Sequence, residues 1–399
     1  MKKCMTWLMA ALCSVAVAAP AVAADTIKIG VQGAHSGDLA SYGVPSLNAA
    51  KIVIEEANAK GGVLGKKIEL VSQDDQCKPE LATNAATKLI SDKVVAIMGP
   101  ICSGATNASL PMFESANIIS ISPTATTPAL TLEGKHPLFL RTVANDNAQA
   151  QLTSSYITDV LKAKKVAYLH DNGEYGKGFA QQNRTILEKA GVETVLFEAV
   201  TPDAVDFSAV VRKLRRAKAD VLVFGGYQNT ASKLVQQMRR DRVKTPLIGP
   251  DGVKDETFLK MTGKDSEGVM ASYPKDTSTL PMYKQARDAH VKQFGSEPGF
   301  GYYNAYAATQ ALLKAIEVAG STDTDKIMAA LKSTEVDTPL GKLSFNKAGD
   351  ATGLGLSVYV VKDGKFVESD HSITLHESDT MAHGRGGTAS APSCPLAPG

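Results

Sequence analysis

The stretch VVAIMGPICSGAT, residues 94–106, shows the arrangement around which the rest of this sequence is organised. Five consecutive apolar residues are soon followed by a cysteine, and then by serine, glycine and threonine, where a helix is predicted to begin. A continuous apolar run of this length is typical of a strand buried on both faces of a parallel sheet. The stretch therefore predicts a buried strand whose carboxyl end opens onto a loop of small and hydroxyl residues.

Two further segments have the same arrangement. The predicted strand 68–71 is followed by Asp74-Asp75-Gln76-Cys77, and the predicted strand 118–121 by the hydroxyl-rich loop 122–126. The carboxyl ends of parallel strands lie at one edge of a sheet, and ligands of such sheets bind there. The pattern predicts one disulfide beside a small-molecule pocket built from strand ends.

Strand and helix patterns alternate from residue 26 to residue 272, in two successive series. Such alternation predicts an α/β fold with two doubly wound parallel sheets. Three helices and two short strands follow the second series. The predicted strands are 27–31, 68–71, 94–98, 118–121, 166–169, 192–197, 221–224, 246–248, 340–345 and 356–362, and the three late helices are 281–294, 302–319 and 323–333.

The N-terminus, residues 1–23, has the pattern of a secretory signal. Lys2 and Lys3 precede an apolar run from Met5 to Val17, and a small-residue cleavage site lies at 21–23. Removal of both lysines lowers the formal charge from +2 to about zero. This argues against a nucleic-acid partner, which needs a basic surface.

The positions of the five cysteines predict one disulfide. Cys4 and Cys13 lie in the signal, and Cys394 lies in a C-terminal segment rich in Gly, Ser, Pro and His. Only Cys77 and Cys102 remain in the body of the chain, and an exported protein meets oxidising surroundings. We predict that they are bonded, which would stabilise the fold by roughly 3 kcal/mol in the loop-entropy model. The alternative is a pair of free buried thiols.

Enzyme and cofactor motifs are incomplete in this sequence. His35 and Ser36 are shifted from the G-x-S-x-G pattern of a nucleophile elbow, and residues 61–66 lack the spacing of a phosphate-binding loop. His170 precedes Asp171 but has no evident serine partner, so we expect it to order its own loop. We therefore predict no enzymatic activity, no cofactor and no metal.

Taken together, short segments across the chain resemble periplasmic solute-binding proteins of ABC transporters, of the leucine/isoleucine/valine type. The resemblance runs in order from residue 26 to about 368 and covers nearly the whole mature chain. It is carried by residues 27–30, 36–37, 42–43, 59–62, 74–77, 102–103, 122–126, 170–171, 175–176, 225–227, 249–252 and 306–308.

This resemblance implies two lobes joined by three crossing segments, which we place near residues 144, 273 and 353. Lobe 1 would comprise residues 24–144 and 274–353, lobe 2 residues 145–273 and 354–370, and residues 371–399 a disordered tail. It further implies a periplasmic protein, expected to be a monomer, that captures an aliphatic amino acid between its lobes and delivers it to a membrane permease. Binding of another solute, such as an aromatic acid, an amide or another amino acid, stays open, as does a role as a sensor.

The resemblance also implies partners for the two charged ends of an amino acid. Ser103 and Thr126 match residues that bind the ligand carboxylate, and Asp251 matches the partner of the ammonium, with the Thr124 backbone carbonyl as a second acceptor. Without the resemblance, Ser103 would be interpreted as a helix cap, and Thr126 and Asp251 as turn residues. Asp251 stands where glutamate is expected, and aspartate is shorter by roughly 1.5 Å.

Aromatic residues complete the predicted site. Tyr42, Tyr175 and Tyr227 match positions that line the cleft of the family and would cover an aliphatic side chain. The alternative for each is a packing role within a lobe or on its surface. Phe300, Tyr302 and Tyr303 lie near another aromatic position of the family, in a region of looser alignment.

Overall fold

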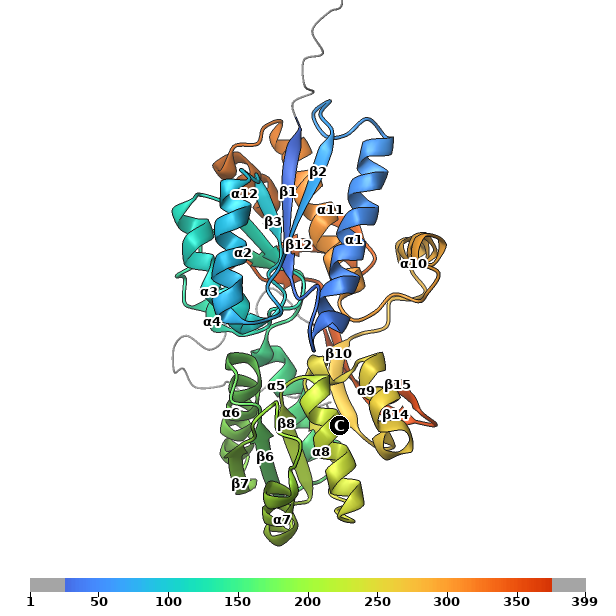
Figure 1. Ribbon diagram of the computed structural model, residues 1–399. Coiled ribbons are helices and arrows are strands. Elements are labelled where there is room, and N and C mark those ends of the chain that lie inside the picture. The colour runs from blue at the N-terminus through green and yellow to red at the C-terminus, as the bar shows by residue number, and fades with distance from the viewer. Residues whose placement is uncertain (1–25, 375–399) are drawn as a thin grey trace, which may run out of the picture.

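The computed structural model describes residues 26–374, which form two lobes, one above the other in Figure 1. Each lobe is built on its own sheet. The predicted signal, residues 1–23, and residues 375–399 of the predicted tail lie outside the described residues. No helix within residues 26–374 combines the length and the apolar character needed to cross a membrane.

Lobe 1 is built on a parallel sheet with the strand order β2-β1-β3-β4-β5. This is one of the two common orders of doubly wound folds, and its topological switch point lies between β1 and β3. The elements are β1 (Ile27–Gly33), α1 (Ala40–Ala59), β2 (Ile68–Asp74), α2 (Pro79–Ser91), β3 (Ala96–Met98), α3 (Ser103–Ser115), β4 (Ile119–Ser122), α4 (Ala129–Leu132) and β5 (Phe139–Arg141). A later segment adds α10 (Pro281–Phe294), α11 (Tyr302–Ala319), α12 (Thr324–Ser333) and the small sheet of β11 (Val336–Thr338), β12 (Gly341–Phe345) and β13 (Ala351–Thr352).

Lobe 2 repeats this order as β7-β6-β8-β9-β10 and extends it with two antiparallel strands, β14 and β15. Its elements are α5 (Asp146–Ser155), the π-helical turn η1 (Tyr156–Val160), β6 (Lys165–His170), α6 (Glu174–Lys189), β7 (Glu193–Ala199), α7 (Ser208–Ala217), β8 (Val221–Gly225), α8 (Gln228–Arg240) and β9 (Leu247–Gly249). They continue with the 3₁₀ turn η2 (Asp251–Val253), α9 (Glu256–Thr262), the 3₁₀ turn η3 (Gly263–Ser266), β10 (Met270–Pro274), β14 (Gly355–Lys362) and β15 (Lys365–Thr374).

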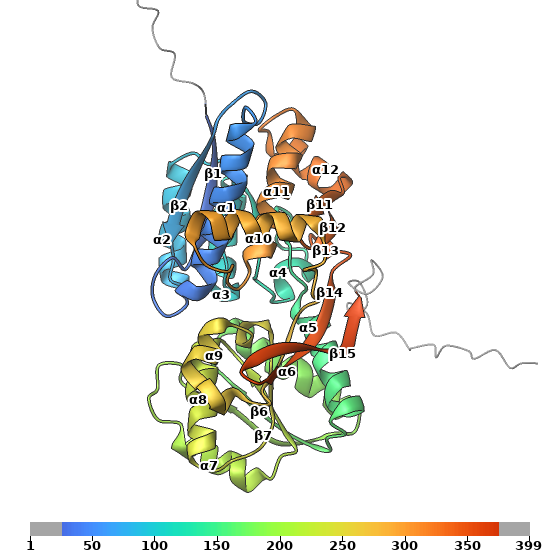
Figure 2. The same ribbon diagram turned by 90° about the vertical axis from the view of Figure 1, so that its right-hand side faces the viewer.

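The chain passes between the lobes three times. The passages are the residues between β5 and α5 (142–145), between β10 and α10 (275–280), and between β13 and β14 (353–354). Figures 1 and 2 show these segments at the junction of the two lobes. The fold is therefore the predicted one, two doubly wound α/β lobes with three crossing segments.

The apolar runs of the sequence form the centres of both sheets. Ile29 and Val31 of β1 are fully buried, as are Leu222 and Phe224 of β8. Helices cover both faces of each sheet, so strand residues are buried irrespective of the direction in which they point. Each fully buried aliphatic or phenyl side chain contributes about 1.5–3 kcal/mol relative to its exposed state.

Two boundaries differ from the sequence-based expectation. The predicted tail began at His371, but β15 continues to Thr374 because residues 372–374 pair with β14 and His371 Nε2 lies 2.8 Å from Ser155 Oγ. Leu47, Ala50, Ile54 and Ala57 mark the apolar face of the helix that the sequence predicts here, but α1 begins earlier, at Ala40, and contains Pro45. Proline normally disfavours a helix interior, so the earlier start depends on tertiary contacts that the local pattern does not contain.

The predicted disulfide is present. Cys77 and Cys102 are bonded, with a Cα–Cα distance of 5.4 Å, which lies in the usual range for a disulfide. The bond joins the loop after β2 to the residue that precedes α3. It therefore ties together two strand-end loops of lobe 1.

A buried ion pair anchors the last segment of lobe 1 to β5. The Arg141 side chain is fully buried, and its Nε donates to Asp350 Oδ1 at 2.5 Å. The guanidinium also donates to the backbone carbonyls of Ala125 and Thr127, at 3.1 and 2.8 Å, and to the Thr131 hydroxyl. The Arg141 guanidinium thus holds two loops, the one that follows β4 and the one that follows β12.

We predict that Asp350→Asn lowers the free energy of unfolding by about 3–5 kcal/mol, because it leaves a buried guanidinium without its counterion. Urea denaturation measures this change. Glu335→Gln, which breaks the exposed ion pair with Lys342 on the neighbouring strand, is the matched control and should have little effect. Equal stability losses in both variants would contradict a special role for the buried pair.

Candidate ligand-binding site

Corresponding strand ends of the two lobes supply the predicted site residues. In lobe 1 the segments after β1, β3 and β4 carry Tyr42, Ser103 and Thr124 with Thr126, respectively. In lobe 2 the segments after β6, β8 and β9 carry Tyr175, Tyr227 and Asp251. Since the strand order is the same in both lobes, the two sets are equivalent in topology. The structure places both sets at the junction between the lobes.

The lobe 1 side presents hydroxyl groups at the start of α3. Ser103 and Thr126 are buried, and Ser103 Oγ accepts a hydrogen bond from Thr127 N at 3.3 Å. The Thr126 hydroxyl is buried, and its interaction with the Asp146 carboxyl group lowers the pKa of that group against the larger effect of burial. Thr124 is half-buried, and its hydroxyl donates to Ile101 O at 2.8 Å. This side therefore combines a helix N-terminus, which favours an anion, with the buried hydroxyl groups of Ser103 and Thr126.

The lobe 2 side is centred on the carboxylate of Asp251, which is 3% exposed. Its Oδ1 accepts hydrogen bonds from Tyr175 Oη at 2.5 Å, from Gln149 Nε2 at 3.1 Å and from Gly252 N at 3.0 Å. None of the hydrogen bonds found within residues 26–374 uses Oδ2. A Cβ at Gly252 would lie 2.9 Å from Tyr175 Oη, so glycine is needed for this close approach.

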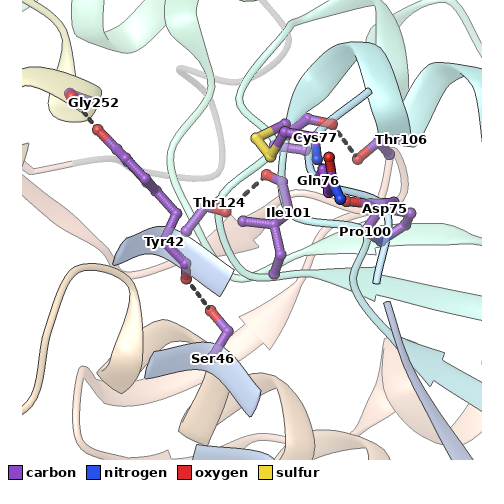
Figure 3. The surroundings of a disulfide bond; sticks show 12 residues. Tyr42, Ser46, Asp75, Gln76, Cys77, Pro100, Ile101, Thr106, Thr124 and Gly252 are labelled. Carbon is purple, nitrogen blue, oxygen red and sulfur yellow. Dashed lines mark hydrogen bonds between the residues drawn. A yellow bond between two sulfur atoms is a disulfide. The ribbon is translucent and has the colours of Figure 1, made fainter. Parts of the chain in front are cut away.

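Aromatic rings from both lobes surround the carboxylate. The Tyr42 ring centroid lies 5.6 Å from that of Tyr227 and 4.3 Å from that of Phe300, and the Tyr175 and Tyr227 rings are 5.0 Å apart. Figure 3 shows Tyr42 extending from α1 toward Gly252, whose carbonyl accepts the Tyr42 hydroxyl hydrogen bond. The same view places the disulfide beside Ile101 and Thr124.

The other two aromatic residues named from the sequence lie elsewhere. Tyr302 is buried in lobe 1, where its hydroxyl donates to Ala286 O at 2.8 Å, and Tyr303 stacks on Tyr283 at a centroid distance of 3.9 Å. Phe300 and Tyr303 both line a cavity of about 570 Å³ formed by residues of the two lobes. The Lys254 ammonium lies in its wall, 3.9 Å from the ring centroid of Tyr273.

Hydrogen bonds join the two lobes across this site. Besides the bond from Tyr42 to Gly252, Gln228 Nε2 donates to Ser41 Oγ at 3.0 Å, and Asn107 Nδ2 donates to Glu174 Oε2 at 3.2 Å. The lobes are therefore in direct contact through side chains of α1, α3, α6 and α8. Their separation would expose the rings and the Asp251 carboxylate to water.

Sequence reasoning missed two residues of this network. Asp146, the first residue of α5, is fully buried, and its Oδ1 accepts a hydrogen bond from Gln149 Nε2 at 3.0 Å. Gln149 therefore bridges Asp146 and Asp251. Asp146 and Gln149 are three residues apart and so lie on one face of α5, immediately after the first crossing segment. This spacing is the sequence signal that could have marked both as residues of the site.

Burial controls the protonation of the two carboxyl groups. It raises the pKa of Asp146 well above its ordinary value, and the negative charge of Asp251 raises it further. Burial also raises the pKa of Asp251, against the hydrogen bonds from Tyr175 and Gln149, which lower it. The site thus holds two carboxyl groups whose ionised forms are disfavoured by burial.

Comparison with known proteins decides the family. A family model described as "Periplasmic binding protein" matches residues 26–365. The chain belongs to this family. A relative from Pseudomonas aeruginosa, named as a leucine-, isoleucine-, valine-, threonine- and alanine-binding protein, is 33% identical over 352 residues, which cover 88% of this chain and 94% of the relative.

Solved structures of similar proteins contain different ligands. The branched-chain amino acid transporter substrate-binding protein of Streptococcus pneumoniae, in complex with isoleucine, is 27% identical with a TM-score of 0.78, covering 86% of this chain and 100% of that one. A solute-binding protein of Rhodopseudomonas palustris, in complex with 3,4-dihydroxybenzoic acid, is 25% identical with a TM-score of 0.73, covering 88% and 97%. Membership of this binding-protein family therefore leaves the ligand to be argued from the site.

We predict that Asp146→Asn changes the pH dependence of stability of the ligand-free protein. The unfolded carboxyl group ionises near pH 4, whereas the folded group keeps its proton to a higher pH. The unmodified protein therefore loses stability as the pH rises through this interval, by about 1.4 kcal/mol for each unit by which the pKa is raised.

The variant does not undergo this loss, so it should gain stability relative to the unmodified protein as the pH rises above the pKa of the unfolded carboxyl group, about 4. A series of urea denaturation curves at increasing pH measures the difference. A stability difference that is independent of pH would show that Asp146 is ionised throughout.

Proposed function

We propose that this protein captures an aliphatic, branched-chain amino acid between its two lobes and delivers it to the permease of an ABC transporter. It acts as a periplasmic monomer exported by the signal at residues 1–23, and it binds its ligand without transforming it. The lobes are the proposed segments 24–144 with 274–353, and 145–273 with 354–370, the second now extended to Thr374.

The observation that carries this proposal is the complementarity of the two sides of the site. Ser103 and Thr126 offer hydroxyl groups beside a helix N-terminus, which suits a carboxylate. Asp251 offers a buried carboxylate, which suits an ammonium. A zwitterion has both charges on one small molecule, and the rings of Tyr42, Tyr175 and Tyr227 supply an apolar surface for its side chain.

The isoleucine complex of the Streptococcus pneumoniae relative and the name of the Pseudomonas aeruginosa relative support the same class of ligand. An aromatic acid is the second candidate, because a structural relative binds 3,4-dihydroxybenzoic acid. Such an acid has a carboxylate but no ammonium. It would leave the buried Asp251 without a cation, which is unfavourable.

The mechanism that we propose is closure of the lobes around the ligand. Each lobe holds only part of the polar groups that an amino acid needs, so the ligand interacts more strongly with the closed arrangement than with the open one. The hydrogen bonds from Tyr42 to Gly252 and from Gln228 to Ser41 belong to the closed arrangement. The permease would recognise that closed form.

Asp251→Asn should weaken binding of leucine, isoleucine or valine by at least about tenfold, because a charge-assisted hydrogen bond to a buried ammonium is lost. Isothermal titration calorimetry measures the change. Asp255→Asn is the matched control: Asp255 is a buried aspartate that caps α9 through Thr257 N at 2.7 Å, and asparagine is an equally good cap.

An Asp251→Asn variant with unchanged affinity would remove this residue from the site. If the unmodified protein binds 3,4-dihydroxybenzoate and none of the three amino acids, the second candidate replaces the first.

Saturating ligand should reduce the radius of gyration measured by small-angle X-ray scattering, because ligand shifts the lobes toward closure. Tyr227→Ala should weaken both affinity and closure, since the Tyr227 ring contacts Tyr42 across the lobes and Tyr175 within its own. The ligand should be recovered chemically intact. Identical scattering with and without bound ligand, or a chemically altered ligand, would defeat the capture mechanism.

A further inference from the structure

A cavity of about 570 Å³ lies beside the candidate amino-acid site but is not part of it. Neither Ser103 nor Asp251 is among the described residues that line the cavity. Phe300 stands between the two places, because its ring centroid lies 4.3 Å from that of Tyr42 in the site and 5.7 Å from that of Tyr273 in the cavity wall. The volume is typical of pockets that bind small molecules, and the proposed function gives this cavity no role.

Aromatic side chains from both lobes form much of the cavity wall. Among the described residues, lobe 1 supplies Tyr283, Phe300 and Tyr303, and lobe 2 supplies Tyr273, Tyr359 and Phe366. The second crossing segment adds residues 275–277. Figure 2 shows α10 of lobe 1 and β15 of lobe 2 on the same side of the molecule. A flat aromatic molecule in this cavity would therefore pack against rings of both lobes.

Lys254 contributes a positive charge to the same wall. Its Nζ lies 3.9 Å from the ring centroid of Tyr273, 4.6 Å from that of Tyr359 and 5.9 Å from that of Phe366. None of the hydrogen bonds and ion pairs found within residues 26–374 uses this nitrogen. Burial lowers the pKa of Lys254 to about 8. The rings stabilise the ammonium, but its three N–H donors lack an acceptor from the described part of the chain.

The acidic groups near Lys254 do not supply that acceptor. Those that attract the ammonium electrostatically are Glu256, Asp276, Asp255 and Glu368. Asp255 accepts a hydrogen bond from the backbone of α9, Asp276 from the turn that follows it, and Glu368 from a hydroxyl group of β14. Glu256 is exposed to solvent. A carboxylate that enters the cavity could therefore bond to the ammonium directly.

We propose that this cavity is a second binding site, for a small aromatic carboxylate, and that it is occupied together with the amino-acid site. The carboxylate accepts hydrogen bonds from the Lys254 ammonium, and the ring packs among the aromatic side chains. Since the wall comes from both lobes, the bound acid stabilises their closed arrangement. By linkage, the acid and the amino acid each raise the affinity of the other by the same factor.

A purely structural role of these residues makes a different prediction. Lys254 directly follows the turn η2, which carries Asp251, and its contacts with Tyr273 and Tyr359 would then serve only to hold that turn against β10 and β14. In that case the cavity binds no acid, and loss of the charge changes stability alone. Binding of a carboxylate and of its uncharged analogue separates the two roles.

The test titrates benzoate into the protein saturated with L-leucine, by isothermal titration calorimetry. Benzamide, which has the same ring and no charge, is the matched compound. Lys254→Met keeps an apolar stem of similar length and removes the charge, and Lys260→Met, the control, removes an exposed lysine of α9 that does not line the cavity. Titrations of L-leucine with and without saturating benzoate measure the coupling and verify that each variant is folded.

We expect benzoate to bind at least about tenfold more tightly than benzamide, and Lys254→Met to weaken benzoate binding by a similar factor, because a charge-assisted hydrogen bond is lost in both cases. Leucine binding without benzoate should change by less than about twofold in Lys254→Met, because the proposed amino-acid site lies outside the cavity. Lys260→Met should change neither affinity. Saturating benzoate should strengthen leucine binding by at least about fivefold.

Displacement of leucine by benzoate would show one shared site and overturn the proposal. Equal affinities for benzoate and benzamide, unchanged benzoate binding in Lys254→Met, or leucine binding that benzoate does not strengthen would overturn it as well. These outcomes leave the proposed function intact. If the unmodified protein binds none of leucine, isoleucine and valine, the proposed function fails. Benzoate binding that is lost in Lys254→Met and kept in Asp251→Asn would then still support the second site, and the reverse pattern would overturn it.

Discussion

The junction of the two lobes is governed by one constraint: a charge removed from water must find an opposite charge or lose its own. Arg141 and Asp350 satisfy the constraint within the protein, with every side of the guanidinium occupied. Asp146 and Asp251 have no such pair, and burial instead disfavours their charged forms by raising the pKa of both carboxyl groups. The same region thus contains one completed ion pair, which stabilises the fold, and two buried carboxyl groups bridged by Gln149.

The duplicated topology explains how these groups come together. Both lobes have the strand order of a doubly wound fold, and in each the first, third and fourth strands in chain order end at the junction. Lobe 1 contributes hydroxyl groups and a helix N-terminus there, and lobe 2 contributes a carboxylate. In the proposed function, a ligand with two opposite charges is held by groups from two bodies, so its binding is coupled to their approach.

Rigid supports surround the site on the lobe 1 side. The disulfide joins the loops after β2 and β3, and Asp75, next to it, accepts hydrogen bonds from Cys77 N at 2.8 Å and Gln32 Nε2 at 3.1 Å. Ser103 is the residue that follows Cys102, so the covalent bond limits its movement. In the proposed closure mechanism, groups held in this way would keep their geometry when the lobes separate, which lowers the entropy lost on binding.

The sequence alone determined the α/β fold, its two doubly wound series and the disulfide, because these depend on local signals, whereas the candidate site residues came from the family resemblance. Continuous apolar runs mark buried strands, two cysteines remain after export, and hydroxyl or acidic residues directly follow strands. The roles of Ser103, Thr126 and Asp251 came from the family resemblance rather than from their residue types.

Tertiary structure decided the rest. The pairing of residues 372–374 with β14, the early start of α1 and the bridge from Gln149 to Asp251 all depend on partners distant in the chain, in the last case 102 residues apart. Asp146 looks like an ordinary acidic residue at the start of a helix. Only the fold shows that it is buried and linked through Gln149 to a second carboxylate, because burial and long-range contacts are properties of the assembled structure and not of a local pattern.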